Sequence, residues 1–286
     1  MAEEEGGPGE PRFIAVEGFR FIVEEGPEKP QFPLLAENVP REPRVPLFAN
    51  KDELQEAIRI YVQTHGVNCP HGPIGTWDVS NIVDMSNLFH GCGTFNEPLD
   101  GWDVSNVVNM QCMFYGCHAF NQPLDTWNVS HVANMISMFN NCHAFNQPLD
   151  TWNVSHVIQM QGMFIECTAF NQPLQHWNVS NVTNMYSMFS GCTAFNQPLD
   201  TWNVSNVTHM YAMFCGCTAF NQPLADWDVS NVTNMYRIFH GCIAYNHNLF
   251  AWTQQNPPVQ EYLMLFSEAN QWTHCMNPEQ FAYLLK

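Results

Sequence analysis

Basic residues are scarce in this chain, and the shortage is uneven along it. The 286 residues include 9 Lys and Arg against 27 Asp and Glu, for a formal net charge of −18. After Arg59 the only basic residues are Arg237 and Lys286, against 14 acidic ones. Nucleic-acid binding requires a basic face that neutralises phosphates. We therefore expect no nucleic-acid binding by this part of the chain.

Long apolar runs are missing as well. No stretch approaches the roughly 20 apolar residues that a membrane-spanning helix needs, so we expect no membrane insertion. Residues 1–11 are acidic, are interrupted by Gly and Pro, and lack the basic and apolar regions of a secretory signal. We expect an intracellular or virion-associated protein, with the cell surface as the alternative if an export signal lies outside this sequence.

Motifs of catalysis are the third absence. The sequence has no G-x-S-x-G, no phosphate-binding glycine loop and no H-E-x-x-H. His65, Cys69 and His71 lie close together in the sequence, but they have no obvious fourth ligand for zinc. We expect no enzymatic activity, no bound metal and no cofactor.

What the chain has in abundance is repetition with a period of 25 residues. One column of the repeat consists of Trp77, Trp102, Trp127, Trp152, Trp177, Trp202, Trp227 and Trp252. A second consists of Cys92, Cys117, Cys142, Cys167, Cys192, Cys217 and Cys242. A short period held over most of a chain indicates one unit stacked on itself, with neighbours completing each other's core. We predict that both columns are structural, with the Cys as buried free thiols rather than disulfides.

Apolar spacing within one unit predicts a strand followed by a helix. The expected strand carries Leu124, Trp127 and Val129, and apolar and polar residues alternate over its second half, from Trp127 to Val129. The expected helix has two to three turns and one apolar face formed by Val132, Met135, Met138, Phe139 and Cys142. A column of Asn residues follows, and we expect its amides to satisfy backbone groups of adjacent units: Asn96, Asn121, Asn146, Asn171, Asn196, Asn221 and Asn246.

The pattern W-[ND]-V-S-N-V-T-N-M-x-x-M-F-x-x-C-x-x-F-N-x-P-L, most typical in residues 195–199 and 202–208, resembles the repeat of the BspA-like leucine-rich-repeat surface proteins. The resemblance covers residues 76–252. It implies an α/β fold, a right-handed leucine-rich-repeat-like solenoid with short strands on one face and short helices on the other. Members of that family occur in bacteria, protists and large DNA viruses, and their usual role is adhesion or protein interaction.

The sequence divides into four parts. Residues 1–49 contain an acidic tail, a hairpin over residues 12–23 and a Pro-rich arm that either straps the repeats or anchors a partner. Residues 50–75 are expected to form a capping helix and a linker, with Asn50 or Asp52 as the N-cap. Residues 76–252 form seven repeats. Residues 253–286 are expected to form a helical cap at the other end.

Two surface columns are candidates for partner binding. Tyr186, Tyr211 and Tyr236 follow the column Met in three consecutive repeats, beside Arg237; they form either a partner-binding patch or packing between repeats. The second column consists of Asp100, Asp125, Asp150 and Asp200. We expect these residues either to keep the face soluble, or to bind a basic partner or, weakly, a divalent cation. The function expected is a non-catalytic protein-interaction or assembly scaffold of a virus or microbe. The alternative is an extracellular adhesin that binds host protein or glycan.

Overall fold

The computed structural model describes residues 12–16, 19–23 and 47–255. The chain divides into two compact units, Met1–Arg44 and Val45–Lys286. In the first unit, strands β1 (Arg12–Val16) and β2 (Phe19–Val23) pair antiparallel, with Val16 opposite Phe19. This is the pairing predicted for residues 12–23. The expected turn at residues 17–18 and the Pro-rich arm lie outside the described residues.

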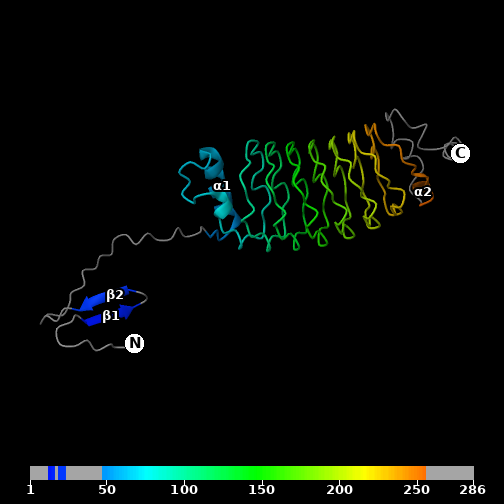
Figure 1. The fold of residues 1–286 in the computed structure, drawn as a ribbon. Helices are drawn as coiled ribbons and strands as arrows, with labels where there is room; N and C mark the ends of the chain where they lie inside the picture. The colour runs from blue at the N-terminus through cyan, green and yellow to red at the C-terminus, as the bar shows by residue number, and fades with distance from the viewer. Residues whose placement is uncertain (1–11, 17–18, 24–46, 256–286) are drawn as a thin grey trace. The chain divides into compact units, whose positions relative to one another are not determined.

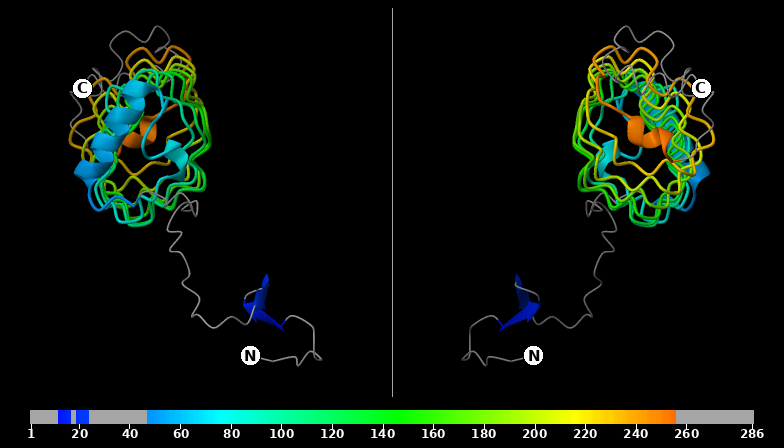
Figure 2. Two further views of the ribbon diagram at one scale, coloured as in Figure 1. Left: turned by 90° about the vertical axis from the view of Figure 1, so that its left-hand side faces the viewer. Right: turned by 90° about the vertical axis from the view of Figure 1, so that its right-hand side faces the viewer.

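The second unit contains a row of 25-residue coils stacked side by side (Figure 1). Seen along the row, the coils lie in register one behind another (Figure 2). The first coil is residues 77–101, and each later coil begins at the next Trp of the column. Successive coils are joined by single parallel bridges that link Asp84, Asn109, Asn134, Gln159, Asn184, His209 and Asn234 in order. The chain is therefore a tandem-repeat array in which each coil pairs with its neighbours.

Each coil is a chain of tight turns. In residues 124–142, backbone hydrogen bonds join Trp127 N to Leu124 O (3.1 Å), Val132 N to Val129 O (3.0 Å), Met138 N to Met135 O (3.3 Å) and Cys142 N to Phe139 O (2.9 Å). Every one of these turns begins and ends at a buried apolar residue three positions apart. The apolar spacing of the repeat is thus the spacing of its turns.

The expected strand and helix do not form in the repeats. Across residues 77–249 the structure has only turns and single bridges. Two residues of each coil have a left-handed backbone, a conformation that no helix accommodates. One follows the first column Met by two positions: Asn87, Cys112, Ser137, Gly162, Ser187, Ala212 and Arg237. The other lies four residues later: Gly91, Gly116, Asn141, Glu166, Gly191, Gly216 and Gly241. The leucine-rich-repeat assignment and the right-handed sense stay predictions.

The core consists of columns that run through all the coils. Phe114 stacks on Phe139 with ring centroids 5.6 Å apart, and Trp177 on Trp202 with centroids 6.4 Å apart. Polar atoms of the columns are satisfied by the preceding coil. Trp127 Nε1, for example, donates to Leu99 O at 3.0 Å. The same bond recurs at Trp102, Trp152, Trp177 and Trp202. The column Trp residues therefore contribute both apolar burial and a fixed register.

The Cys and Asn columns behave in a similar way. Cys117 Sγ donates to Phe89 O at 3.0 Å, and Cys142 and Cys192 make the equivalent bonds. Cys92, at the edge of the first coil, is only half-buried. Asn121 N donates to Asn96 Oδ1 at 2.8 Å, and the bond is repeated at each later Asn of the column up to Asn246. The predicted role of the Asn amides, satisfying backbone groups of adjacent repeats, is confirmed.

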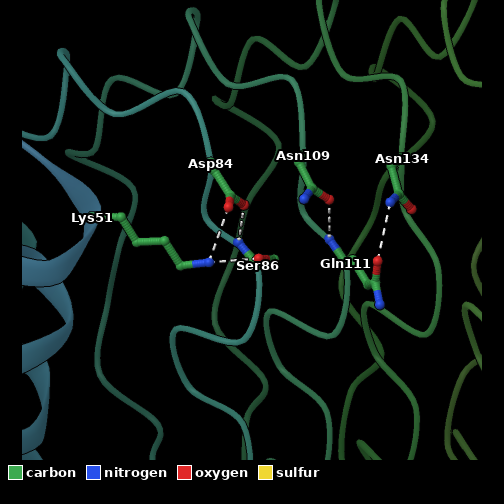
Figure 3. Close-up of polar contacts among 6 residues, drawn as sticks. All are labelled: Lys51, Asp84, Ser86, Asn109, Gln111 and Asn134. Atoms are coloured by element: carbon green, nitrogen blue, oxygen red, sulfur yellow. Dashed lines mark hydrogen bonds and ion pairs between the residues drawn. The ribbon is translucent and has the colours of Figure 1, made fainter.

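Helix α1 (Lys51–Thr64) covers the first coil. It begins after Asn50, whose side chain accepts from Glu53 N, and it buries Leu54, Ala57, Ile58 and Tyr61, the four residues expected to share a face. Lys51 Nζ donates to Asp84 Oδ2 (3.1 Å) and Ser86 Oγ (2.5 Å) of that coil (Figure 3). A short 3₁₀ helix (Ile74–Thr76) leads into Trp77.

At the other end of the array, helix α2 (Phe250–Thr253) begins at the last two residues of the seventh coil. The C-terminal cap expected over residues 253–286 lies outside the described residues from residue 256 on. Within the part of the chain that the structure covers, no helix has the length and apolarity needed to cross a bilayer.

Candidate functional site

The three tyrosines form a continuous stack on the surface of coils five to seven. Tyr186 and Tyr211 have ring centroids 4.9 Å apart and an interplanar angle of 6°, and Tyr211 and Tyr236 are 5.7 Å apart at 30°. Tyr186 is 46% exposed, and the other two are half-buried. An Asn two residues earlier orients the backbone of two of them: Asn184 Oδ1 accepts from Tyr186 N at 2.9 Å, and Asn234 Oδ1 accepts from Tyr236 N at 3.1 Å. The structure thus brings the predicted residues together.

Arg237 lies against the third ring of this stack. Its backbone is left-handed, with φ 59°, and its Cζ lies 5.4 Å from the ring centroid of Tyr236. A hydrogen bond and charge interaction with the Tyr236 side chain raise the pKa of the guanidinium. We call Tyr186, Tyr211, Tyr236 and Arg237 the tyrosine stripe. Because Tyr186 and Tyr211 stack face to face and Tyr236 packs against them at a tilt, the stripe offers mainly ring edges, hydroxyls and the guanidinium to a partner.

A column of threonines beside the stripe was not recognised from the sequence. Thr183, Thr208 and Thr233 lie three residues before the three tyrosines, and Thr208 Oγ1 donates to Thr183 O at 3.1 Å. In the first four coils the same position carries Val83, Val108, Ala133 and Ile158. The three Thr are 25 residues apart, so the column could have been predicted from the sequence. Coils five to seven therefore have a surface chemistry, Thr beside Tyr, that the first four coils lack.

The Asp column lies elsewhere on the coil. Asp200, for example, precedes Tyr211 by eleven residues. Asp100, Asp125 and Asp200 are exposed, whereas Asp150 is half-buried and its carboxylate pairs with His176 Nδ1. Gln175 interrupts the column between Asp150 and Asp200. The structure therefore does not bring the Asp column and the tyrosine stripe into one site.

Of the three possible zinc ligands, His65, Cys69 and His71, the last packs against aromatic rings. The ring of His71 lies 5.5 Å from that of Phe48 and 5.7 Å from that of Trp77. Among the residues with assigned positions, no three His, Cys, Asp or Glu side chains come together in a way that could hold a metal ion.

Comparison with known proteins places the repeats in a family. A model of the family described as "Mycoplasma protein of unknown function, DUF285" matches residues 59–177 and again residues 160–277. No curated protein and no solved structure matches the chain. The two family matches overlap and together span well over half of the sequence. This chain belongs to the DUF285 family.

Proposed function

We propose that this protein is a non-catalytic protein-interaction scaffold of a virus or microbe, related to the BspA-like leucine-rich-repeat proteins, and that a protein partner binds the tyrosine stripe. The observation that carries the proposal is the stack itself. Three Tyr and the only Arg of the array lie together on one surface. Tyr and Arg are the residues most enriched among those that dominate binding energy at interfaces.

The array does not need aromatic residues at this position. The four earlier coils carry Ser86, Gln111, Ile136 and Gln161 there and form the same turns and bridges. Stacked rings separated by one coil are also rigid, so little side-chain entropy is lost when a partner binds. The guanidinium only donates hydrogen bonds and the phenol hydroxyls can also donate them, so we propose a partner that presents carbonyl or carboxylate oxygens to the stripe.

The test is a triple substitution of Tyr186, Tyr211 and Tyr236 to Ser, used as bait beside the unmodified chain in affinity capture with mass spectrometry. Ile136→Ser is the matched control because it changes the same position in an unrelated coil. Partner capture that is lost in the triple variant and kept in the control supports the proposal, provided that both variants melt cooperatively. Capture of the same partner by the triple variant would show that the stripe only packs between coils.

The alternative function, an extracellular adhesin, is favoured by one observation. The Asn residues of four N-x-S sequons, Asn128, Asn153, Asn178 and Asn203, are all exposed. Protease treatment of intact source cells distinguishes the two functions. An adhesin is removed from the cell surface, whereas an intracellular scaffold is left intact.

The Asp column either only keeps its face soluble, or binds a basic partner or a cation weakly. Substitution of Asp100 and Asp125 to Asn in the same capture experiment tests for the basic partner.

A further inference from the structure

The hydrogen bonding between coils follows one register along the whole array. In the first pair of coils, Phe89 N donates to Met113 O at 2.9 Å and Gly91 N to Tyr115 O at 2.7 Å. Equivalent bonds recur in every later pair up to Gly216 N and His240 O. Each coil thus accepts hydrogen bonds through alternate carbonyls from the coil before it.

The first coil has no coil before it. The residues equivalent to Met113 and Tyr115 are Leu88 and His90, 25 positions earlier. Their carbonyls accept no hydrogen bond from any residue whose position is described. The edge of the array therefore presents two alternate carbonyl acceptors. In each later coil the equivalent carbonyls accept hydrogen bonds from the preceding coil.

These two residues line a groove between the first coil and α1. The groove has a volume of about 590 Å³. Its apolar part includes Ile58, Val62, Leu88 and Cys92, and Gln55 and Asp52 form part of the α1 side. A segment from outside the repeats already pairs with this coil at another point, since Phe48 N donates to Asp78 O at 3.3 Å. Backbone pairing of the first coil with a segment outside the repeats therefore already occurs at Asp78.

The charges along the groove indicate the partner's chemistry. Arg59 is held by Glu56, with Nε–Oε2 at 2.7 Å, and Lys51 is held by Asp84. Asp52 is exposed and pairs with no basic residue in the described part of the chain. An uncompensated carboxylate beside an apolar groove favours a Lys or Arg on the occupant.

We propose that this groove binds an extended peptide of a partner protein, which adds to the edge as a strand. Its alternate N–H groups donate to the carbonyls of Leu88 and His90, and a Lys or Arg of the peptide lies beside Asp52. Strand addition of this kind gives affinity through main-chain hydrogen bonds and specificity through side-chain pockets. The site is separate from the tyrosine stripe, which lies in coils five to seven, so the two proposals fail independently.

The probe is a fluorescent hexapeptide of alternating character, Lys-Thr-Val-Thr-Val-Lys, titrated into the full chain. Two N-methylated versions are the controls on the peptide. Methylation of every second amide leaves one edge of N–H donors, and methylation of all amides leaves none. We expect the first version to keep its affinity and the second to lose at least about tenfold, a loss of about 1.4 kcal/mol. Equal binding of all three peptides, or binding of none, would overturn the proposal.

Variants of the protein locate the site. Gln55→Trp fills the groove from an exposed position of α1, and we expect it to weaken binding at least tenfold, about 1.4 kcal/mol. Ile60→Trp is the matched control because Ile60 lies on α1 but does not line this groove. The triple substitution of the tyrosine stripe should leave peptide binding unchanged. If Gln55→Trp melts normally and binds as the unmodified chain does, the groove is not the site.

Discussion

At the scale of single residues, backbone conformation decides which side chains the repeat tolerates. The second left-handed position of the coil carries Gly in five of seven coils, but Glu166 occupies it with φ 57°. A left-handed backbone costs a residue with a Cβ about 1–2 kcal/mol, and Gly removes this cost. We expect Glu166→Gly to stabilise the array by about 1 kcal/mol, measured by urea unfolding. An unchanged or lower stability would mean that the exposed Glu166 side chain makes compensating contacts.

The reverse substitution tests the same argument. A Cβ added at Gly216 would lie 3.7 Å from the nearest atoms, so there is room for it, but φ there is 73°. Gly216→Ala should therefore lose about 1–2 kcal/mol through backbone strain alone. Gly precedes five of the seven column Cys, a pattern visible in the sequence that indicates the left-handed turn. The apolar spacing of the same residues indicates a helix instead, and that prediction is wrong because the left-handed residues interrupt it.

At the scale of elements, the sequence predicted α1 well and the repeat poorly, for a physical reason. In α1 the cap, the acidic first turn and the apolar face all indicate a helix, and the structure has that helix. In the repeat, Met135, Met138 and Cys142 have helical spacing, but a chain of three-residue turns produces the same spacing. Only the left-handed residues between them distinguish the two. The groove beside α1 was not predictable because it depends on the hydrogen-bond register between coils.

The contact between α1 and the first coil depends on a partly exposed ion pair. Burial raises the pKa of Asp84, but hydrogen bonds from Ser86 and the Lys51 ammonium outweigh it, and the net pKa is lowered. The later coils have Asn or Gln at this position in most cases, and Asn109 makes the same turn, accepting from Gln111 N at 3.1 Å (Figure 3). Asp84→Asn therefore removes the charge and keeps the turn.

We expect Asp84→Asn to lose less than about 1 kcal/mol at pH 7, because solvent screens the pair. A lowered carboxyl pKa stabilises the fold above the unfolded value of about 3.9, and this contribution disappears as the pH falls through the folded value. Urea unfolding of both proteins at pH 7 and pH 3 measures the difference. A difference between them that is as large at pH 3 as at pH 7 would indicate that it does not come from the carboxylate charge.

At the scale of the whole molecule, stability is a sum over coils and the contacts between neighbours. The buried thiols make this sum depend on pH. Burial raises the pKa of Cys142, Cys192 and Cys217 well above the ordinary value, and neighbouring thiols of the column add to the shift. Each Sγ also donates to a backbone carbonyl, a bond that the thiolate loses. The folded array therefore keeps these protons at pH values where the unfolded chain releases them.

A raised thiol pKa contributes stability that is fully present below the unfolded value of about 8.5 and is lost as the pH rises above it. Each such thiol lowers the free energy of unfolding by about 1.4 kcal/mol per pH unit in that range.

Cys192→Ala removes one of them. At pH 7 we expect the variant to be less stable by about 1 kcal/mol, through the lost volume and hydrogen bond. Between pH 8.5 and 10 the variant should lose stability less steeply, so that it equals or exceeds the unmodified chain. Guanidinium unfolding of both proteins under reducing conditions across this range measures the two slopes, and other alkaline titrations cancel in the comparison. Parallel slopes would show that the column thiol ionises as readily in the folded array as in the unfolded chain.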